Sequence, residues 1–293
     1  MICVRLEGGL GNQLFQHAAG RALALRHGTR LLWDPDMLLH PPAGVTPRHF
    51  ELDRFQVHGA LARPGQVRGM RWLRRLGKAS AMFSNWRAYR ESRAGFDRGF
   101  ARLGDTSYLV GYWQSFRYFE SCAAELSAEL QPVLPLSPAS AELLARIQAH
   151  ETIAVHVRRG DYVSLAAAAR YHGVLPLAYY TEALQRLQSR HPRAGLLVFS
   201  DDPDWCRAQL PCPAAQTGFV THNQGGDAWQ DLVLMAACRH HVIANSSFSW
   251  WGAWLADQRQ DLPGRQVFAP AQWFAATRIA ARDRFPGHWQ VLG

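Results

Sequence analysis

The chain has 293 residues, enough for two domains of about 145 residues each or for one large domain. Its composition, 48% hydrophobic and 19% charged, is that of an ordinary globular protein, and no apolar run approaches the roughly 20 residues that span a bilayer. The net charge of +9 predicts an acidic partner, namely a nucleotide, a nucleic acid or an anionic membrane surface. The five cysteines are scattered, which favours reduced thiols in a cytoplasm over a disulfide framework or a zinc site.

The beginning of the chain has the pattern of a nucleotide-type βαβ unit. An apolar strand at 2–7 is followed by a glycine turn that contains Asn12 and Gln13, then by a helix and a short strand at 30–33. The dinucleotide-binding fingerprint fails, because Leu14 stands where its third glycine belongs, so a dehydrogenase is not favoured. The turn would bring backbone N–H groups and the Asn12 side chain to a cleft, and a plain tight turn is the alternative.

Residues 63–102 form an irregular, strongly basic stretch in which Glu91 and Asp97 are the acidic residues. Apolar residues recur there at every third position, as in a short basic amphipathic helix that can rest on an anionic membrane. These residues are Val67, Met70, Leu73 and Leu76. A solvated surface is the other interpretation. Binding of nucleic acid is not favoured, because no nucleic-acid-binding motif accompanies the charge.

A predicted strand at 108–112 leads into Trp113 and Gln114. At the end of a strand, an aromatic ring that stacks and an amide that hydrogen-bonds are groups that suit a sugar. Three prolines then mark a linker, so we place a domain boundary within 131–140.

The second half alternates strands and helices, which is the pattern of a parallel sheet with helices on both faces. The predicted strands are at 152–158, 196–199, 219–221, 241–244 and 267–269. The first of them is an apolar run without alternation, as expected for a strand that is buried on both faces.

Three of these strands end in charged or polar residues, and open α/β sheets bind ligands just beyond the carboxyl ends of their strands. Arginines after the first strand offer planar forks of donors that match phosphate oxygens. Aspartates after the second offer acceptors for a ribose hydroxyl or for the N–H edge of guanine. The fourth strand runs into a helix N-terminus, where free backbone N–H groups and the helix dipole attract anions. The residues concerned are Arg158 and Arg159, Asp201 and Asp202, and Asn245, Ser246 and Ser247.

Each of these groups also has a purely structural interpretation, as a solvated basic turn or as helix caps. Their joint occurrence at strand ends favours a nucleoside diphosphate site. A rival interpretation takes Asp202 and Asp204, or Asp34 and Asp36, as ligands of Mg²⁺ or Mn²⁺. We favour charge neutralisation by arginine without a metal, and the scattered histidines form no zinc constellation.

Six motifs, in order along nearly the whole chain, resemble those of the α-1,2-fucosyltransferases of glycosyltransferase family 11. They are GGLGNQLFQ at 8–16, GYWQS at 111–115 with Tyr118 and Phe119, HVRRGDY at 156–162, FSDD at 199–202, DL and LM within 231–235, and NSSFSWWGAWL at 245–255. The resemblance implies an α/β fold of two Rossmann-like domains in a GT-B-like architecture. We expect an N-terminal acceptor-side domain at 1–135 and a C-terminal domain at 136–293 that binds GDP-L-fucose.

The activity implied by the resemblance is that of an inverting galactoside α-1,2-fucosyltransferase. It would move L-fucose from GDP-β-L-fucose to a galactose 2-hydroxyl of a glycan acceptor, without a metal or another cofactor. Vertebrate members carry a membrane anchor that this sequence lacks, so we expect a bacterial, cytoplasmic form. The basic stretch 63–102 would allow peripheral contact with the anionic inner face of the membrane, where lipid-linked glycan precursors are found.

The residues matching the family motifs receive roles on this basis. We assign Arg158 to the leaving diphosphate, whose negative charge grows in the transition state. The residues expected around the donor are His156, Arg158, Arg159, Asp201, Asp202, Asn245, Ser246, Ser247 and Phe248, and those expected around the acceptor are Asn12, Gln13, Trp113 and Gln114.

The general base stays open among Asp161, His156 and no base at all, in which case the leaving phosphate takes the proton. Asn12 would orient the acceptor hydroxyl or the donor sugar. Two other functions remain as alternatives: a metal-dependent glycosyltransferase with another nucleotide-sugar donor, and a non-catalytic glycan-binding protein.

Overall fold

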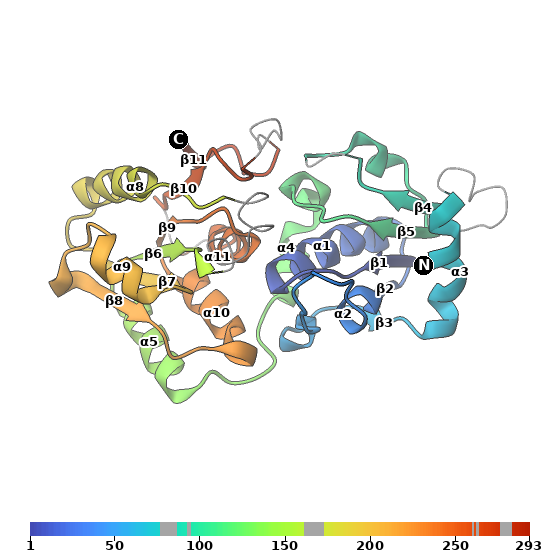
Figure 1. Ribbon diagram of the computed structural model, residues 1–293, viewed down its shortest axis with the longest axis horizontal. Coiled ribbons are helices and arrows are strands. Elements are labelled where there is room, and N and C mark those ends of the chain that lie inside the picture. The colour runs from blue at the N-terminus through green and yellow to red at the C-terminus, as the bar shows by residue number, and fades with distance from the viewer. Residues whose placement is uncertain (77–86, 93–94, 161–172, 260, 262–263, 276–282) are drawn as a thin grey trace. The chain divides into compact units, whose positions relative to one another are not determined.

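The computed structural model describes residues 1–76, 87–92, 95–160, 173–259, 261, 264–275 and 283–293 (Figure 1). Within it the chain divides into two compact units. Unit 1 comprises Met1–Val133 and Arg282–Arg284, and unit 2 comprises Leu134–Ala281 and Phe285–Gly293. Each unit is built on a parallel sheet, so the expected fold class of two Rossmann-like α/β domains is confirmed. The return of the chain to unit 1 near its C-terminus was not predicted.

Unit 1 has a five-stranded parallel sheet in the order β3-β2-β1-β5-β4. Its strands are β1 (Ile2–Arg5), β2 (Leu31–Asp34), β3 (Ala60–Leu61), β4 (Arg87–Arg90) and β5 (Ser107–Val110). Its helices are α1 (Leu10–Arg26), α2 (Asp36–Leu39), α3 (Pro64–Leu76) and α4 (Ala123–Glu129), with short 3-10 turns η1 (Leu52–Arg54), η3 (Arg98–Arg102), η4 (Phe116–Tyr118) and η5 (Glu120–Cys122). The central strands β1 and β5 are buried along their whole length, as expected of strands covered on both faces.

Unit 2 has a six-stranded parallel sheet in the order β11-β10-β9-β6-β7-β8. Its strands are β6 (Thr152–Val157), β7 (Gly195–Ser200), β8 (Thr217–Val220), β9 (His240–Val242), β10 (Val267–Pro270) and β11 (Gln290–Leu292). Its helices are α5 (Pro138–Ala149), α8 (Leu177–Arg190), α9 (Pro203–Gln209), α10 (Trp229–Ala237) and α11 (Ser247–Asp257), with 3-10 turns η6 (Ala214–Gln216) and η7 (Gly225–Asp227).

The strand order of unit 2 is that of the Rossmann fold, and it places β6 and β9 side by side at the point where the order reverses. Ligands of such sheets bind in the crevice outside the carboxyl ends of the strands at this point. In unit 1 the corresponding neighbours are β1 and β5. The loops that leave these four strands are therefore where ligands are expected.

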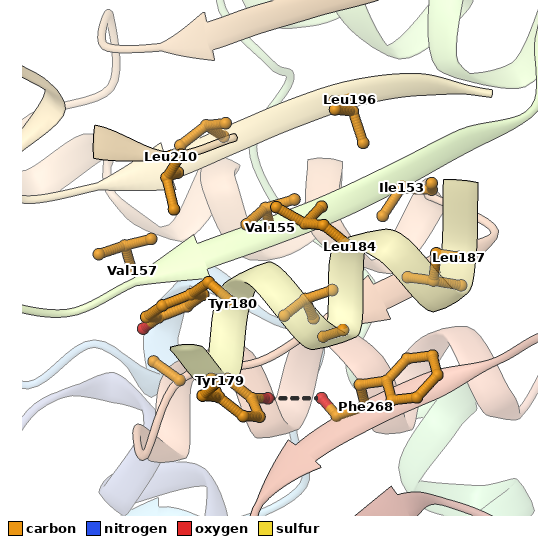
Figure 2. Packing of buried hydrophobic residues seen from close by; sticks show 14 of the residues in the cluster. Ile153, Val155, Val157, Tyr179, Tyr180, Leu184, Leu187, Leu196, Leu210 and Phe268 are labelled. Atoms are coloured by element: carbon orange, nitrogen blue, oxygen red, sulfur yellow. Dashed lines mark hydrogen bonds between the residues drawn. The ribbon is translucent and has the colours of Figure 1, made fainter. Parts of the chain in front are cut away.

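The core of unit 2 holds β6 rigidly in the middle of its sheet (Figure 2). Alternate β6 side chains, Ile153 and Val155 among them, pack against Leu184 and its neighbours on α8. Ala154 packs on the other face with residues of α5 and α10. Tyr179 on α8 donates its hydroxyl to the carbonyl oxygens of Ile243 (2.7 Å) and Phe268 (3.0 Å), which ties the helix to β9 and β10.

The amphipathic helix predicted in the basic stretch is present as α3, and the described part of its apolar face is turned inward. Val67 and Met70 are buried with Cys3 and Tyr108 in the core of unit 1. The side chains of Leu73 and Leu76 lie outside the described part of the chain. Val67 and Met70 are therefore not available for insertion into a membrane, and contact of this helix with a membrane surface stays a prediction. Among the described residues, no helix is both long enough and apolar enough to span a bilayer.

Candidate functional site

Two arginines leave the carboxyl end of β6, and a carboxylate from the end of β7 holds them in place. Asp201 Oδ2 lies 3.1 Å from Arg158 Nη1, and Asp201 Oδ1 accepts a 2.8 Å hydrogen bond from the backbone N–H of Arg159. Gly160 is required next to them, because a Cβ on it would lie 2.7 Å from Asp201 Oδ2. The Arg158 and Asp201 side chains remain 28% and 25% exposed, so their charged ends can reach a ligand.

Arg159, which we expected around the donor, is held more tightly by side-chain contacts. Its Nε lies 3.1 Å from Asp202 Oδ2, and its guanidinium group lies 4.1 Å above the Trp205 ring. Asp202 also caps α9 by accepting from the Trp205 N–H (3.2 Å). Asp161, considered as a general base, lies outside the described residues.

His156 lies on β6 just before the arginines and is buried, with its ring 6.1 Å from that of Phe248. Burial and the neighbouring Arg158 charge lower the pKa of His156 to about 4, so its imidazole is neutral at neutral pH. Its Nδ1 is buried and has no hydrogen-bond partner among the described residues. A ligand that supplied a hydrogen bond to this atom would therefore gain affinity.

The loop after β9 brings the N-terminus of α11 to the same edge of the sheet. Asn245 donates from Nδ2 to the carbonyl oxygens of Gly173 (3.1 Å) and Trp273 (3.5 Å), which fixes the loop. Ser246 caps α11, since its hydroxyl accepts from the Phe248 N–H (3.4 Å). The capping interpretation of Ser246 therefore holds, and the helix still places the positive end of its dipole at this edge.

In unit 1 the loops after β1 and β5 are joined by a hydrogen bond between two predicted acceptor residues. Gln114 donates from Nε2 to Asn12 Oδ1 at 2.8 Å. Gly8 allows the close turn before α1, because its φ is +82° and a Cβ there would lie 2.4 Å from Asn12 Nδ2. Asn12 and Gln114 are both partly exposed, so their remaining polar atoms can meet a ligand.

Two other predicted acceptor residues have structural roles instead. Gln13 is fully buried and hydrogen-bonds the Gly8 and His49 carbonyls and the Glu51 N–H, so it braces the loop beside α1. The Trp113 ring is also fully buried, within 5.2–6.3 Å of the rings of Tyr89, Phe100 and Tyr118. A ring in this position cannot stack on a sugar, so the roles predicted for Gln13 and Trp113 are corrected to structural ones.

Glu91 is a notable residue that the sequence did not single out as functional. It follows β4, and its carboxylate accepts hydrogen bonds from the loop after β5. Burial raises the pKa of Glu91 to about 7, although three hydrogen bonds and the Arg284 charge oppose the rise. The sequence feature that could have pointed to Glu91 is its position as one of two acidic residues in the basic stretch 63–102.

The aspartate pairs considered as metal ligands are engaged elsewhere. Asp34 is buried and accepts from the Tyr108 hydroxyl (2.7 Å), while Asp204 pairs with Arg207 (2.9 Å). The described residues bring together one group with metal-type side chains, which we call the Glu151 cluster. It consists of Glu151, His191 and His240 and lies at the amino ends of β6 and β9, opposite the arginines.

The hydrogen bonds of the Glu151 cluster fix histidine tautomers that do not suit a metal. The Gln266 N–H donates to His240 Nδ1 (3.2 Å), so in the neutral ring Nε2 carries the proton and donates to Glu151 Oε1 (3.2 Å). His191 Nδ1 also faces this oxygen, at 3.1 Å. A bound metal would need a lone pair on His240 Nε2, the nitrogen that is protonated here.

The fold and the site thus define an α/β protein with two arginines and a helix N-terminus at one edge of the unit 2 sheet and a hydrogen-bonded amide pair in unit 1. Residues 76–291 match the model described as Glycosyl transferase family 11. The chain therefore belongs to this family, and it is a glycosyltransferase of the fucosyltransferase type, as its motifs predicted.

Two Escherichia coli proteins are similar to nearly the whole chain. An alpha-1,2-colitosyltransferase is 29% identical over 302 residues, 99% of this chain and 98% of the relative. The O-antigen biosynthesis glycosyltransferase WbnK is 28% identical over 294 residues, 92% of this chain and 94% of the relative. Galactoside alpha-(1,2)-fucosyltransferase 1 of Aotus azarae is 27% identical over 259 residues, 85% of this chain and 64% of the relative.

Among solved structures, a GDP complex of a FUT1 mutant from Arabidopsis thaliana is similar with a TM-score of 0.48 at 12% identity, covering 91% of this chain and 69% of that chain. Fucosyltransferase NodZ from Bradyrhizobium is similar with a TM-score of 0.44 at 14% identity, covering 86% of this chain and 91% of that chain.

Proposed function

We propose that the protein is an inverting α-1,2-fucosyltransferase that moves L-fucose from GDP-β-L-fucose to a galactose 2-hydroxyl of a glycan. The single observation that carries this proposal is the placement of Arg158 at the carboxyl end of β6, beside β9, where Asp201 orients its guanidinium group. The donor is assigned to unit 2 and the acceptor to Asn12 and Gln114 of unit 1.

A change from a β-linked donor to an α-linked product requires one displacement with inversion. The sugar then passes through an oxocarbenium-like transition state, and negative charge grows on the departing diphosphate. Arg158 and the N-terminus of α11 supply fixed positive charge for it, so the reaction needs no metal ion. Asp201 has lone pairs left for a ribose hydroxyl or a guanine N–H, because a carboxylate offers about four acceptor sites.

The proton of the acceptor hydroxyl has no strong base among the described residues of this edge. His156, with a pKa of about 4, is a poor proton acceptor at neutral pH and suits a hydrogen bond to the donor better. The Asn12 and Gln114 pair orients the hydroxyl, and the leaving phosphate or Asp161 takes the proton.

A second candidate donor is a colitose nucleotide, favoured by the similarity to the E. coli alpha-1,2-colitosyltransferase over 99% of this chain. It would use the same unit 2 edge. If colitose is carried by GDP, the two donors differ in the sugar alone, and the choice between them depends on residues around the sugar and not on Arg158.

The test is to incubate the pure protein with β-galactosides and with GDP-fucose, GDP-colitose, UDP-sugars or CMP-sugars, with and without EDTA. We expect an α-1,2-linked fucoside that forms equally well in EDTA. Loss of transfer in EDTA would support a metal-dependent enzyme, and sugar binding without transfer would support a glycan-binding protein. Arg158→Ala should lower kcat/KM roughly a hundredfold, a loss of about 3 kcal/mol in transition-state stabilisation. Arg207→Ala, at an exposed arginine, should leave kcat/KM unchanged.

We also propose a cytoplasmic location with peripheral contact to an anionic membrane. Arg63, just before α3, Arg68 on α3, and Arg87 and Arg90 on the edge strand β4 are exposed. Because the apolar face of α3 is buried, this contact would be electrostatic, with about 1 kcal/mol per arginine near the surface. All five cysteines are free, which suits a reducing compartment.

The membrane contact is tested with vesicles. Binding to vesicles rich in phosphatidylserine should be lost in roughly 0.5 M salt, because salt screens the charges. The double variant Arg68→Glu with Arg87→Glu should also lose this binding. Arg146→Glu, on the exposed side of α5, is the matched control. Binding that resists salt and charge reversal would contradict the proposal.

A further inference from the structure

The loop that carries Gln114 has an unusual backbone. Trp113, the residue before it, has φ +56°, and it is the single non-glycine residue with positive φ in the described part of the chain. The left-handed region is disfavoured for a bulky side chain and persists only where the surroundings enforce it. The enforced conformation sets where the next residue, Gln114, leaves the loop.

A carboxylate from the neighbouring strand enforces this conformation. Glu91 directly follows β4, which pairs in register with β5. Its Oε2 accepts 2.9 Å hydrogen bonds from the backbone N–H groups of both Tyr112 and Trp113. Gly111 makes the approach possible, because a Cβ there would lie 2.6 Å from the Glu91 Cβ and 2.7 Å from Oε2.

The other side of the carboxylate is also occupied. Tyr118 donates its hydroxyl to Glu91 Oε1 at 3.1 Å, and that hydroxyl accepts from the backbone N–H of Asp97 at 2.8 Å. The fully buried Arg284, in the segment that returns to unit 1, contributes an opposite charge. The partners that face the carboxylate are therefore three hydrogen-bond donors and a cation, all of which favour its ionised form.

A purely structural role is the simpler alternative, but it leaves the charge unexplained. Three donors and a cation favour the ionised form, yet burial is the larger influence and brings the pKa of Glu91 to about 7. A neutral glutamine would fill the same space. What the charge adds is a strong acceptor for two consecutive N–H groups of the loop that ends in Gln114.

We propose that Glu91 is a positioning residue for the acceptor sugar: by fixing Trp113 in its left-handed conformation it sets the place of the Gln114 amide, which is paired with Asn12. This inference rests on the proposed function, in which that amide pair meets the acceptor. Glu91 touches neither the donor nor the reacting atoms, so its effect is confined to acceptor binding.

Protonation of Glu91 should release the loop. The groups that face it are Tyr118, Arg284 and, through the Tyr118 hydroxyl, Asp97. The protonated form turns one oxygen into a donor and weakens the other as an acceptor, so the loop loses its strongest hydrogen bonds. With a midpoint near 7, the ionised fraction falls about tenfold between pH 8 and pH 6. Apparent acceptor affinity should fall by the same factor.

The experiment measures β-galactoside binding by calorimetry and KM for both substrates, from pH 6 to pH 8. For the wild type we expect the acceptor Kd and KM to rise about tenfold as the pH falls, while the donor KM stays constant. Glu91→Gln should flatten the acceptor profile, and Glu91→Ala should weaken acceptor binding at every pH. The exposed Glu120→Gln is the matched control and should retain the wild-type profile.

The outcomes separate this inference from the proposed function. If the wild type transfers fucose and Glu91→Gln keeps the wild-type acceptor profile, the role of Glu91 is refuted and the function stands. If no transfer occurs but galactoside binding follows the predicted profile, the function fails and the positioning role stands. Equal changes in donor and acceptor affinity, or no galactoside binding by the folded wild type, would overturn the inference.

Discussion

Replacing Asp201 by asparagine tests whether a neighbouring carboxylate is what orients Arg158. In the wild type, Asp201 Oδ2 lies 3.1 Å from Arg158 Nη1 and Oδ1 accepts from the Arg159 N–H at 2.8 Å. Asparagine has nearly the same shape and keeps one acceptor oxygen. Its amide can satisfy the Arg159 N–H or face the guanidinium group, but it cannot do both, because its second group is a donor.

The expected magnitude follows from these two contacts. The ion pair is about a quarter exposed, so it contributes about 1 kcal/mol, and the hydrogen bond to a charged acceptor contributes roughly 1.5 kcal/mol, part of which asparagine retains. We expect a loss of about 2 kcal/mol in the free energy of unfolding, or roughly 5 °C in Tm. A freed Arg158 should lower kcat/KM about tenfold, less than the loss expected for Arg158→Ala.

A double-mutant cycle in the transferase assay isolates the orienting effect. Arg158→Ala should cost less in the Asp201→Asn background than in the wild type, with a coupling of about 1 kcal/mol. Asp204→Asn, whose carboxylate is 94% exposed, controls for the loss of a charge at the start of α9. Additive losses, or an Asp201→Asn enzyme within about twofold of the wild type, would refute this account of Arg158.

Three further predictions concern stability. Burial raises the pKa of Glu91 to about 7, so between pH 4.5 and 7 the native state binds more protons than the unfolded chain. The free energy of unfolding should therefore fall by about 3 kcal/mol as the pH rises through this window. Urea titrations at several pH values should show this fall for the wild type and not for Glu91→Gln. For Glu129 burial acts in the same direction, but the hydrogen bond and charge of Arg21 and the neighbouring His17, whose Nε2 lies 3.6 Å from Oε2, outweigh it and hold its pKa at about 2. Its stabilisation is therefore present above pH 4.5 and lost toward pH 2, and Glu129→Gln should cost about 3 kcal/mol at pH 7 and much less at pH 3 in the same measurement. Zinc should leave the Tm unchanged, because the tautomers of the Glu151 cluster do not suit a metal; a rise in Tm that Glu151→Gln removes would contradict this.

The sequence predicted the features that depend on local pattern. The run without alternation that begins at Thr152 is a strand buried along its whole length, as predicted. The alternation of strands and helices in the second half required a parallel sheet. Because all carboxyl ends of such a sheet lie at one edge, the sequence alone predicts that the arginines and the start of α11 lie at the same edge.

Features that depend on contacts distant in sequence were missed or misassigned. Trp113 and Gln114 are adjacent at the end of a strand, yet one is fully buried and the other is partly exposed, because an aromatic cluster takes the Trp113 ring. Apart from its place as one of two acidic residues in a basic stretch, nothing local distinguishes Glu91 from a solvated glutamate. Its carboxylate faces Tyr118 and Arg284. Arg284 is 193 residues further along the chain, in the segment that returns to unit 1.

The two units share one device at the loops assigned to ligands. In each unit, the first residue after a strand is acidic, and its carboxylate accepts hydrogen bonds from backbone N–H groups in the loop after the neighbouring strand. Asp201, after β7, accepts from the loop after β6, and Glu91, after β4, accepts from the loop after β5. In each loop a glycine, Gly160 or Gly111, lies where a Cβ would come within 2.7 Å of that carboxylate. The loops have left their sheets, so their N–H groups lack ladder partners, and a carboxylate supplies several acceptor sites at once. In both units a carboxylate that follows the adjacent strand thus fixes a loop beyond the end of its strand, and a glycine in that loop makes room for the carboxylate. The residue held in place is Arg158 in unit 2 and Gln114 in unit 1.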